Sequence, residues 1–107
     1  MRRGHPNAQL AILGWGRLES ETRSLVHERG LDGSVHLFGR FEPAAWLERA
    51  DVFAHTSRWE GFGIVLLEAM LAGLPIVATR ASAIPEIVVD GTTGLLAAVG
   101  DAGGVAN

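Results

Sequence analysis

Short apolar runs alternate with segments of helical pattern along this chain, and this alternation limits the fold more than any other feature. Two of the runs end in glycine, as is typical where a buried strand meets a turn. Parallel strands need long crossover connections, so the alternation predicts an α/β fold with a Rossmann-like, doubly wound parallel sheet. We expect strands within residues 9–14, 35–39, 51–55, 75–79 and 94–98, and helices within residues 19–29, 44–50, 64–72 and 84–88.

Composition excludes several classes of chemistry. All nine cationic residues are arginine, so a lysine Schiff base and the lysine of a phosphate-binding loop are both excluded. There is no cysteine, hence no disulfide, thiol nucleophile or cysteine metal site, and the net charge of -3 offers no basic field for nucleic acid. The longest apolar region is interrupted by Glu68, Gly73 and Pro75, which makes a membrane span a poor interpretation. We expect a cytoplasmic protein.

The longest apolar region holds one charged residue, Glu68. Helix formers fill residues 64–72, and Gly73 followed by Pro75 marks the end of a helix. At helical spacing Ile64, Leu67, Glu68 and Leu71 form one stripe, which we expect to face the core. Because an unpaired buried charge is costly, Glu68 is expected at a cleft edge or beside a partner with hydroxyl or N–H groups.

The start of this helix has the composition of an anion site. Glu60 precedes Gly61, Phe62 and Gly63, and glycine lets a backbone approach a ligand closely. The first-turn amides of a helix lack intrahelical acceptors, so they suit a phosphate. Ligands of doubly wound sheets bind beyond the carboxyl ends of the strands, where we place the loops around Gly14 and Gly39, residues 56–63 and residues 79–85.

Two other motifs have plainer interpretations. Gly14 and Gly16 form a pair too short for a dinucleotide fingerprint, which argues against a nicotinamide site. The four histidines are scattered without ligand spacing, so no metal site is expected. The glycine-rich residues 100–107 are expected to fray.

The order of these blocks resembles the donor-binding half of group 1 glycosyltransferases, the retaining nucleotide-sugar enzymes with the two-domain GT-B fold. The resemblance covers almost the whole chain. It is carried most strongly by SRWEGFGIVLLEAM at residues 57–70 and GLPIVAT at 73–79. The blocks that complete it are LGWG at 13–16, VHLFG at 35–39, ADVF at 50–53, IPEIV at 84–88 and DGTTGLL at 90–96.

The resemblance implies roles for particular residues. It gives Glu60 the catalytic position near the donor sugar and has Glu68 accept hydrogen bonds from the ribose hydroxyls. The remaining implied donor-binding residues are Gly14, Gly16, Phe38, Gly39, Arg40, Gly61, Phe62, Gly63, Ile64 and Val65. The amides of residues 62–65 would meet the diphosphate and sugar, and the backbone of residues 38–40 would border the base. No metal or other cofactor is implied, because the nucleotide sugar is the substrate.

The chain also departs from the family pattern. Family members carry an earlier strand with basic residues that neutralise the diphosphate, and an amino-terminal acceptor domain. Neither is found within these 107 residues. We therefore expect residues 1–107 to be a truncated donor-binding domain that does not transfer sugar alone. Ser82 and Ala83 occupy positions where the family usually has two glycines.

Three functions fit these patterns. The first is a hexosyl-type transferase that moves sugar from a nucleoside diphosphate to an unknown acceptor. The second is a sugar-nucleotide epimerase of the same fold, which binds a similar donor. The third is a non-catalytic nucleotide-sugar-binding remnant or partner module.

Overall fold

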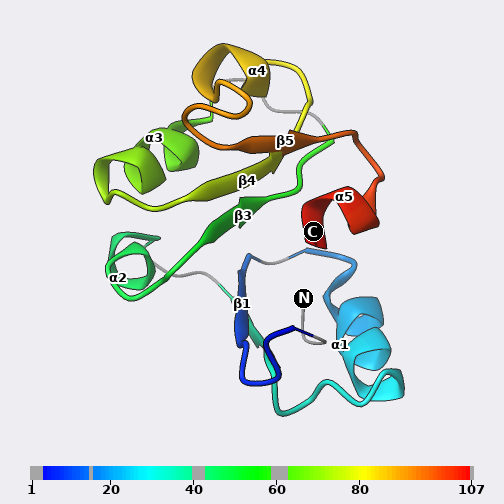
Figure 1. Ribbon diagram of the computed structural model, residues 1–107. Coiled ribbons are helices and arrows are strands. Elements are labelled where there is room, and N and C mark those ends of the chain that lie inside the picture. The colour runs from blue at the N-terminus through cyan, green and yellow to red at the C-terminus, as the bar shows by residue number, and fades with distance from the viewer. Residues whose placement is uncertain (1–3, 15, 40–42, 59–62, 107) are drawn as a thin grey trace. The chain divides into compact units, whose positions relative to one another are not determined.

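The computed structural model describes residues 4–14, 16–39, 43–58 and 63–106 (Figure 1). The chain divides into two compact units, residues 1–42 and 43–107. Each unit is described by itself.

The first unit is a strand, a helix and a second strand. β1 (Leu10–Leu13) and β2 (Val35–Phe38) pair in parallel, with Leu10 opposite Val35 and Leu13 opposite Phe38. The crossover between them contains α1 (Glu19–Glu28), which ends before Gly30. Gly30 has a φ of 65°, the left-handed conformation that glycine adopts most easily at a helix end. The predicted β-α-β order of this unit is confirmed.

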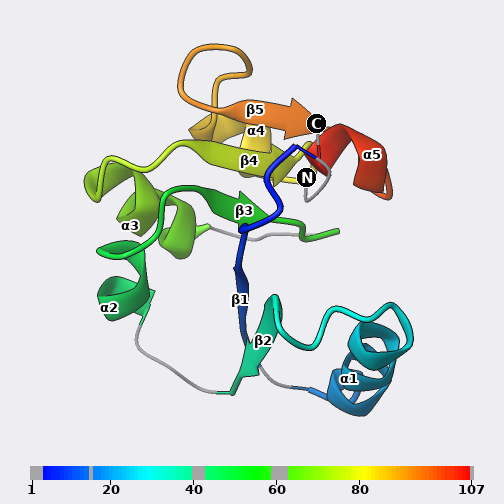
Figure 2. The ribbon, with the colours of Figure 1, turned by 60° about the horizontal axis from the view of Figure 1, so that its bottom comes forward.

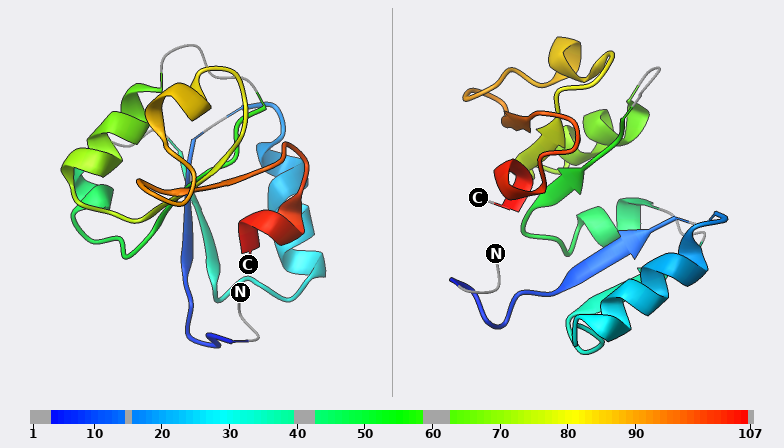
Figure 3. Two further views of the ribbon diagram at one scale, coloured as in Figure 1. Left: turned by 45° about the horizontal axis from the view of Figure 1, so that its top comes forward. Right: turned by 90° about the vertical axis from the view of Figure 1, so that its right-hand side faces the viewer.

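The second unit has a three-stranded parallel sheet in the order β3-β4-β5 (Figure 2). β3 is Phe53–His55, β4 is Ile76–Thr79 and β5 is Leu95–Ala97. α2 (Pro43–Leu47) precedes β3, α3 (Ile64–Leu71) joins β3 to β4, α4 (Ile84–Ile87) joins β4 to β5, and α5 (Ala102–Ala106) follows β5. Figure 3 shows α3 and α5 on opposite sides of this sheet. The predicted α/β class with parallel strands is confirmed, including the edge position of β5.

The core of the second unit is built around β4. Its largest fully buried side chains are Leu66 from α3, Ile76 from β4, Ile84 from α4, and Val88. Ala69 and Ala78 are also fully buried, and their small side chains let α3 come close to the sheet. α3 and β4 are therefore held together by apolar packing.

The predicted buried face of α3 is wrong. Leu66 and Ala69 face the core, whereas Ile64, Leu67 and Leu71 are 60%, 42% and 89% exposed. Glu68 is exposed with them. The helix is apolar almost all the way round, so its spacing does not select one face. The sheet and its neighbours select the side that carries Leu66 and Ala69.

The expected fraying of residues 100–107 is also wrong for the described residues up to 106. Residues Ala102–Ala106 form α5, and Asp101 Oδ1 accepts a hydrogen bond from the Gly104 amide at 2.9 Å. This is the bond of a helix N-cap, and aspartate is among the best residues for it. Asp101 thus offsets the low helix propensity of Gly103 and Gly104.

Candidate functional site

The start of α3 is the described part of the predicted anion site. Gly63 is its N-cap, is buried, and has φ 74° and ψ 39°, a left-handed conformation that suits glycine. Among the residues that the structure describes, no side chain caps this helix, and no acidic residue lies in its first turn. The amides of Leu66 and Leu67 donate to the Gly63 carbonyl at 3.0 and 3.4 Å. The amides of Ile64 and Val65 come earlier in the turn, where no intrahelical acceptor exists.

Glu68 lies one turn after Ile64 on the same exposed stripe. Four residues of α-helix rise by about 6 Å, so the exposed Glu68 side chain lies about that far along the helix from the exposed Ile64. Within the described residues, no hydrogen bond or ion pair to the Glu68 carboxylate is present, although its backbone carbonyl accepts the Ala72 amide at 3.0 Å. The expectation that Glu68 lies on the core-facing stripe of α3 is therefore wrong. An exposed carboxylate is instead available to an external hydroxyl donor.

Gly14, Phe38 and Gly39 come together in the first unit. The Gly14 amide lies 3.1 Å from the Phe38 carbonyl oxygen and 3.2 Å from that of Gly39, which ties the ends of β1 and β2. Phe38 is half-buried, with its ring centroid 6.4 Å from that of His36. Gly16 follows in the connection to α1, and its carbonyl accepts the Glu19 amide at 3.2 Å. These residues lie at the carboxyl ends of parallel strands, as predicted.

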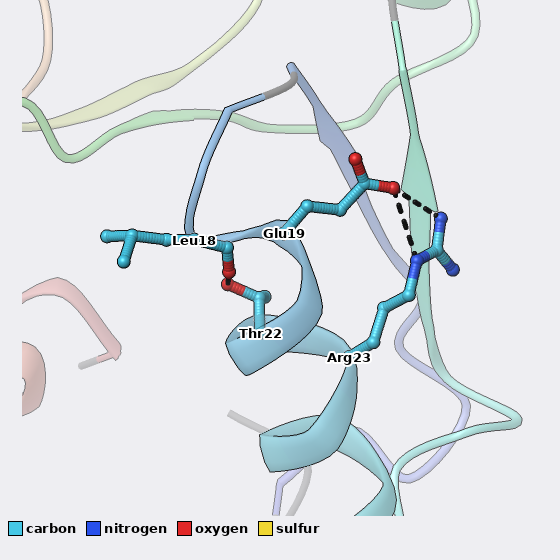
Figure 4. Close-up of polar contacts among 4 residues, drawn as sticks. All are labelled: Leu18, Glu19, Thr22 and Arg23. Atoms are coloured by element: carbon cyan, nitrogen blue, oxygen red, sulfur yellow. Dashed lines mark hydrogen bonds and ion pairs between the residues drawn. The ribbon is translucent and has the colours of Figure 1, made fainter.

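The start of α1 is a poor phosphate site, unlike that of α3. Figure 4 shows Glu19 paired with Arg23, whose Nη2 and Nε lie 2.9 and 3.2 Å from Glu19 Oε1. In the same turn the Thr22 hydroxyl donates to the Leu18 carbonyl at 2.9 Å. Glu19 and Glu21 put two carboxylates at the positive end of the helix dipole. These carboxylates oppose anion binding, although Arg17 and Arg23 also line the open cleft of about 460 Å³ at this turn.

A hydrogen-bonded cluster at the carboxyl ends of β3 and β4 was not predicted from the sequence. The Thr79 hydroxyl donates to the Ser57 carbonyl, and Ser57 Oγ lies 3.0 Å from His55 Nε2. Thr79 is only 3% exposed. The sequence signal that could have revealed this cluster is that its polar residues stand at the ends of apolar runs. We name the side chains of His55, Ser57 and Thr79 the strand-end cluster.

Four predicted site residues lie outside the described residues: Arg40, Glu60, Gly61 and Phe62. Among the described residues no cluster of three or more histidine, aspartate or glutamate side chains has the arrangement of a metal site. No helix in the described part of the chain has both the length and the apolar character needed to cross a membrane.

Comparison with known proteins identifies the family. The family model for group 1 glycosyl transferases matches residues 1–107. The chain is 37% identical over 102 residues to N-acetyl-alpha-D-glucosaminyl L-malate synthase of Bacillus anthracis, covering 94% of this chain and 27% of that protein. It is 38% identical over 100 residues to D-inositol 3-phosphate glycosyltransferase of Arthrobacter sp. (strain FB24), covering 89% of this chain and 24% of that protein.

A solved structure agrees with the sequence comparison. The structure of Anabaena Alr3699/HepE in complex with UDP-glucose has a TM-score of 0.81 and 31% identity, over 89% of this chain and 28% of that one. The chain thus spans about a quarter of the length of the proteins that it matches. The predicted resemblance to GT-B glycosyltransferases is confirmed, and the chain belongs to the group 1 glycosyl transferase family.

Proposed function

We propose that residues 1–107 bind the donor in a retaining glycosyltransferase of hexosyl type, which transfers sugar from a nucleoside diphosphate to an acceptor. The observation that carries the proposal is the start of α3. There the Gly63 conformation, the lack of a capping side chain among the described residues and the lack of acid in the first turn favour a diphosphate on the backbone amides. The first turn of α1 carries two carboxylates, so the start of α3 is the better of the two helix starts for binding a diphosphate.

In this proposal the exposed side of α3 that carries Ile64 and Glu68 binds the phosphates and the ribose of the nucleotide. Amides of Ile64 and Val65 donate to phosphate oxygens, and the Glu68 carboxylate accepts hydrogen bonds from ribose hydroxyls one turn further on. Gly14, Gly16, Phe38, Gly39 and Arg40 border the base and the rim, while Gly61 and Phe62 lead into the helix start. Glu60 acts next to the donor sugar.

The chemistry proposed is electrostatic. As the bond between sugar and diphosphate breaks, negative charge grows on the leaving phosphate, and amides already aimed at it stabilise that charge. The proposal uses no metal ion. The acceptor is bound by a domain outside these residues, which would place this chain's contribution in donor binding and orientation. A cytoplasmic location stays a prediction.

Calorimetric titration with UDP, GDP and ADP tests the binding proposal. UDP is the first probe because the Anabaena neighbour was solved with UDP-glucose. Saturable heat with one of these nucleotides supports donor binding. Absence of heat with all three would overturn it and leave the chain with a packing or partner role. Binding without transfer in the full-length protein would favour the non-catalytic alternative.

The Glu68→Ala variant tests the ribose contact. A hydrogen bond to a charged group contributes about 1.5–3 kcal/mol, so we expect nucleotide affinity to fall by about tenfold or more. Affinity for inorganic pyrophosphate, which has no ribose, will change less than twofold (~0.4 kcal/mol). Glu48→Ala removes another exposed glutamate of the same unit and serves as the control. An equal loss for nucleotide and pyrophosphate would contradict the ribose assignment.

A further inference from the structure

β1 lies at an edge of its sheet, although its residues are those of an interior strand. All of them are apolar, as is usual for a strand of a parallel sheet that is covered on both faces. Yet Leu10, Ala11 and Leu13 are exposed, and Ile12 is only half-buried. In the part of the chain that the structure describes, β1 pairs with β2 alone (Figure 2). The composition of β1 therefore indicates a second neighbouring strand.

The open edge of β1 carries backbone groups without partners. The Leu10 amide donates to the Ser34 carbonyl at 2.8 Å, just before β2 begins. Successive residues of a strand direct their N–H and C=O groups to opposite edges, so those of Ala11 and Leu13 point away from β2. Among the described residues, neither of these two amides donates a backbone hydrogen bond. An edge of this kind is a template for another strand.

The other sheet edges are shorter or better protected. At the outer edge of β5, the Leu96 amide donates to Asp90 Oδ1 at 2.9 Å. At the outer edge of β2, the Val35 amide donates to the Leu31 carbonyl at 2.9 Å. β3 has three residues, of which Ala54 alone directs its amide away from β4. β1 thus offers the longest open edge among the described strands.

Residues 8–14, which contain β1, lack the features that keep an edge strand from pairing. They include no proline and no charged residue. Two copies of this segment can therefore meet without like-charge repulsion. Leu10 and Leu13 are 47% and 37% exposed, and pairing would remove part of this apolar surface from water. A second copy of this chain fits the edge in both charge and hydrophobicity.

We propose that the open edge of β1 pairs with the same edge of a second copy of this chain, which gives a symmetric dimer. Two-fold symmetry makes the pairing antiparallel. With Ile12 on the axis, Ala11 lies opposite Leu13 of the partner subunit, and each such pair exchanges two N–H···O=C bonds. These bonds join two sheets of two strands into one sheet of four, which is a more stable unit. The inference does not depend on the proposed function.

Sedimentation velocity on the 107-residue chain at a series of concentrations tests the association. One short strand buries less than the roughly 1,000 Å² of a stable interface, so we expect a weak dimer that forms at about 10–100 µM. Amide hydrogen exchange on the same samples locates the contact. The amides of Ala11 and Leu13 will exchange about fivefold more slowly once about four fifths of the chain is dimeric, because only the monomer exposes them. The Ala54 amide will not change with concentration.

Three variants make the test specific. Ala11→Pro removes an amide that the pairing with β2 does not use, and proline is tolerated at such edge positions. Ala11→Lys keeps the amide and adds the charge that protects natural edges. Ala54→Pro is the matched control, because it makes the same change at an exposed alanine of β3 whose amide points away from β4. Urea unfolding establishes that each variant is folded.

Both Ala11 variants are expected to weaken the dimer by about tenfold or more. Ala11→Pro removes two of its four hydrogen bonds, and Ala11→Lys places two charges at the contact. Ala54→Pro is expected to change the dissociation constant by less than about twofold. If Ala11→Pro does not fold, Ala11→Lys and the exchange of the wild type decide between the same outcomes.

The outcomes support or overturn the dimer. A dimer with slowed exchange at Ala11 and Leu13, weakened in the Ala11 variants and unchanged in Ala54→Pro, supports it. A chain that is monomeric throughout the series overturns it. Exchange at Ala11 and Leu13 that is slow at every concentration also overturns it, since β1 would then pair within its own chain. Species larger than a dimer, or a dimer that Ala54→Pro weakens equally, would place the contact at another edge and overturn it as well.

Discussion

Asp90 and Arg80 form an ion pair that ties the end of β4 to the turn before β5. Arg80 Nη2 lies 2.8 Å from Asp90 Oδ2, and Asp90 Oδ1 accepts the Leu96 amide at 2.9 Å. The Leu96 bond, followed by the Arg80 bond, lowers the pKa of the Asp90 carboxyl below its ordinary value. The DGTTGLL motif is therefore held to the sheet by its aspartate.

This pair predicts a loss of stability in acid. The pKa of Asp90 is lower in the folded than in the unfolded chain, so the unfolded chain takes up the proton first as the pH falls. The stabilisation is complete above the ordinary carboxyl pKa of about 3.9 and is lost as the pH falls through the folded value. Urea unfolding across this range measures it.

Two variants of this pair make the acid prediction specific. Asp90→Asn will lower stability at pH 6, and its difference from the wild type will shrink in acid. Arg80→Gln will remove only part of the effect, because the Leu96 bond remains. A difference between wild type and Asp90→Asn that stays constant down to pH 2.5 would refute the role of Asp90. Both side chains are about half exposed, at 52% and 43%, so the effect of the pair is small.

Leucines on opposite sides of α3 are expected to differ sharply. Leu66 is fully buried and Leu71 is 89% exposed. Leu66→Ala leaves a cavity beside Ile76 and Ile84 and is expected to lower the free energy of unfolding by about 2–5 kcal/mol. Leu71→Ala is expected to change it by less than about 0.5 kcal/mol. Chemical denaturation compares the two, and similar losses would mean that the face of α3 is assigned wrongly.

Gly94 is required by close packing against β4. A Cβ at this position would lie 2.7 Å from Val88 Cγ1 and 2.9 Å from the Ile76 carbonyl oxygen. Val88 and Ile76 are buried and have little room to move. Gly94→Ala is therefore expected to cost about 1–3 kcal/mol in thermal or urea unfolding. Gly103→Ala, where the nearest contact is an ordinary 3.6 Å, is the control, and an equal loss there would exclude packing as the cause.

Ser82 has a φ of 43°, the left-handed conformation that is unfavourable for residues other than glycine. The neighbouring Ala83 has an ordinary φ of -79°. Ser82→Gly relieves strain that exceeds the entropy cost of glycine, so we expect about 0.5–1 kcal/mol of added stability. Ala83→Gly brings only the entropy cost and is expected to lose about 0.5–1 kcal/mol. Denaturation curves in which both variants lose stability would contradict the strain argument.

Much of the local structure could be predicted from local chemistry. The helix from Ile64 to Leu71 and the strand from Ile76 to Thr79 lie within the expected ranges, because Gly73 and Pro75 separate them. The DGTTGLL block forms a turn in which the Gly91 amide donates to the Gly94 carbonyl at 2.8 Å. Asp101 was a readable N-cap signal that the glycine-rich composition of the following residues concealed.

The candidate site was predicted less completely. The glycine at the start of α3 and the link between Gly14 and the end of β2 agree with the predicted positions at strand ends. Glu68 is exposed, whereas its predicted role was argued from a place on the core-facing side of α3. The strand-end cluster was missed because Thr79 and Ser57 are far apart in sequence, and only the pairing of β3 with β4 brings them within hydrogen-bond distance.

The sequence by itself determined the order of strands and helices as far as β5, the glycine-marked turns and the family, because each depends on residues near one another along the chain. The tertiary structure decided which side of α3 is buried and which hydroxyl holds Ser57. An almost wholly apolar helix has no preferred face until a sheet covers one, and a threonine at a strand end has no defined partner until the neighbouring strand is in register.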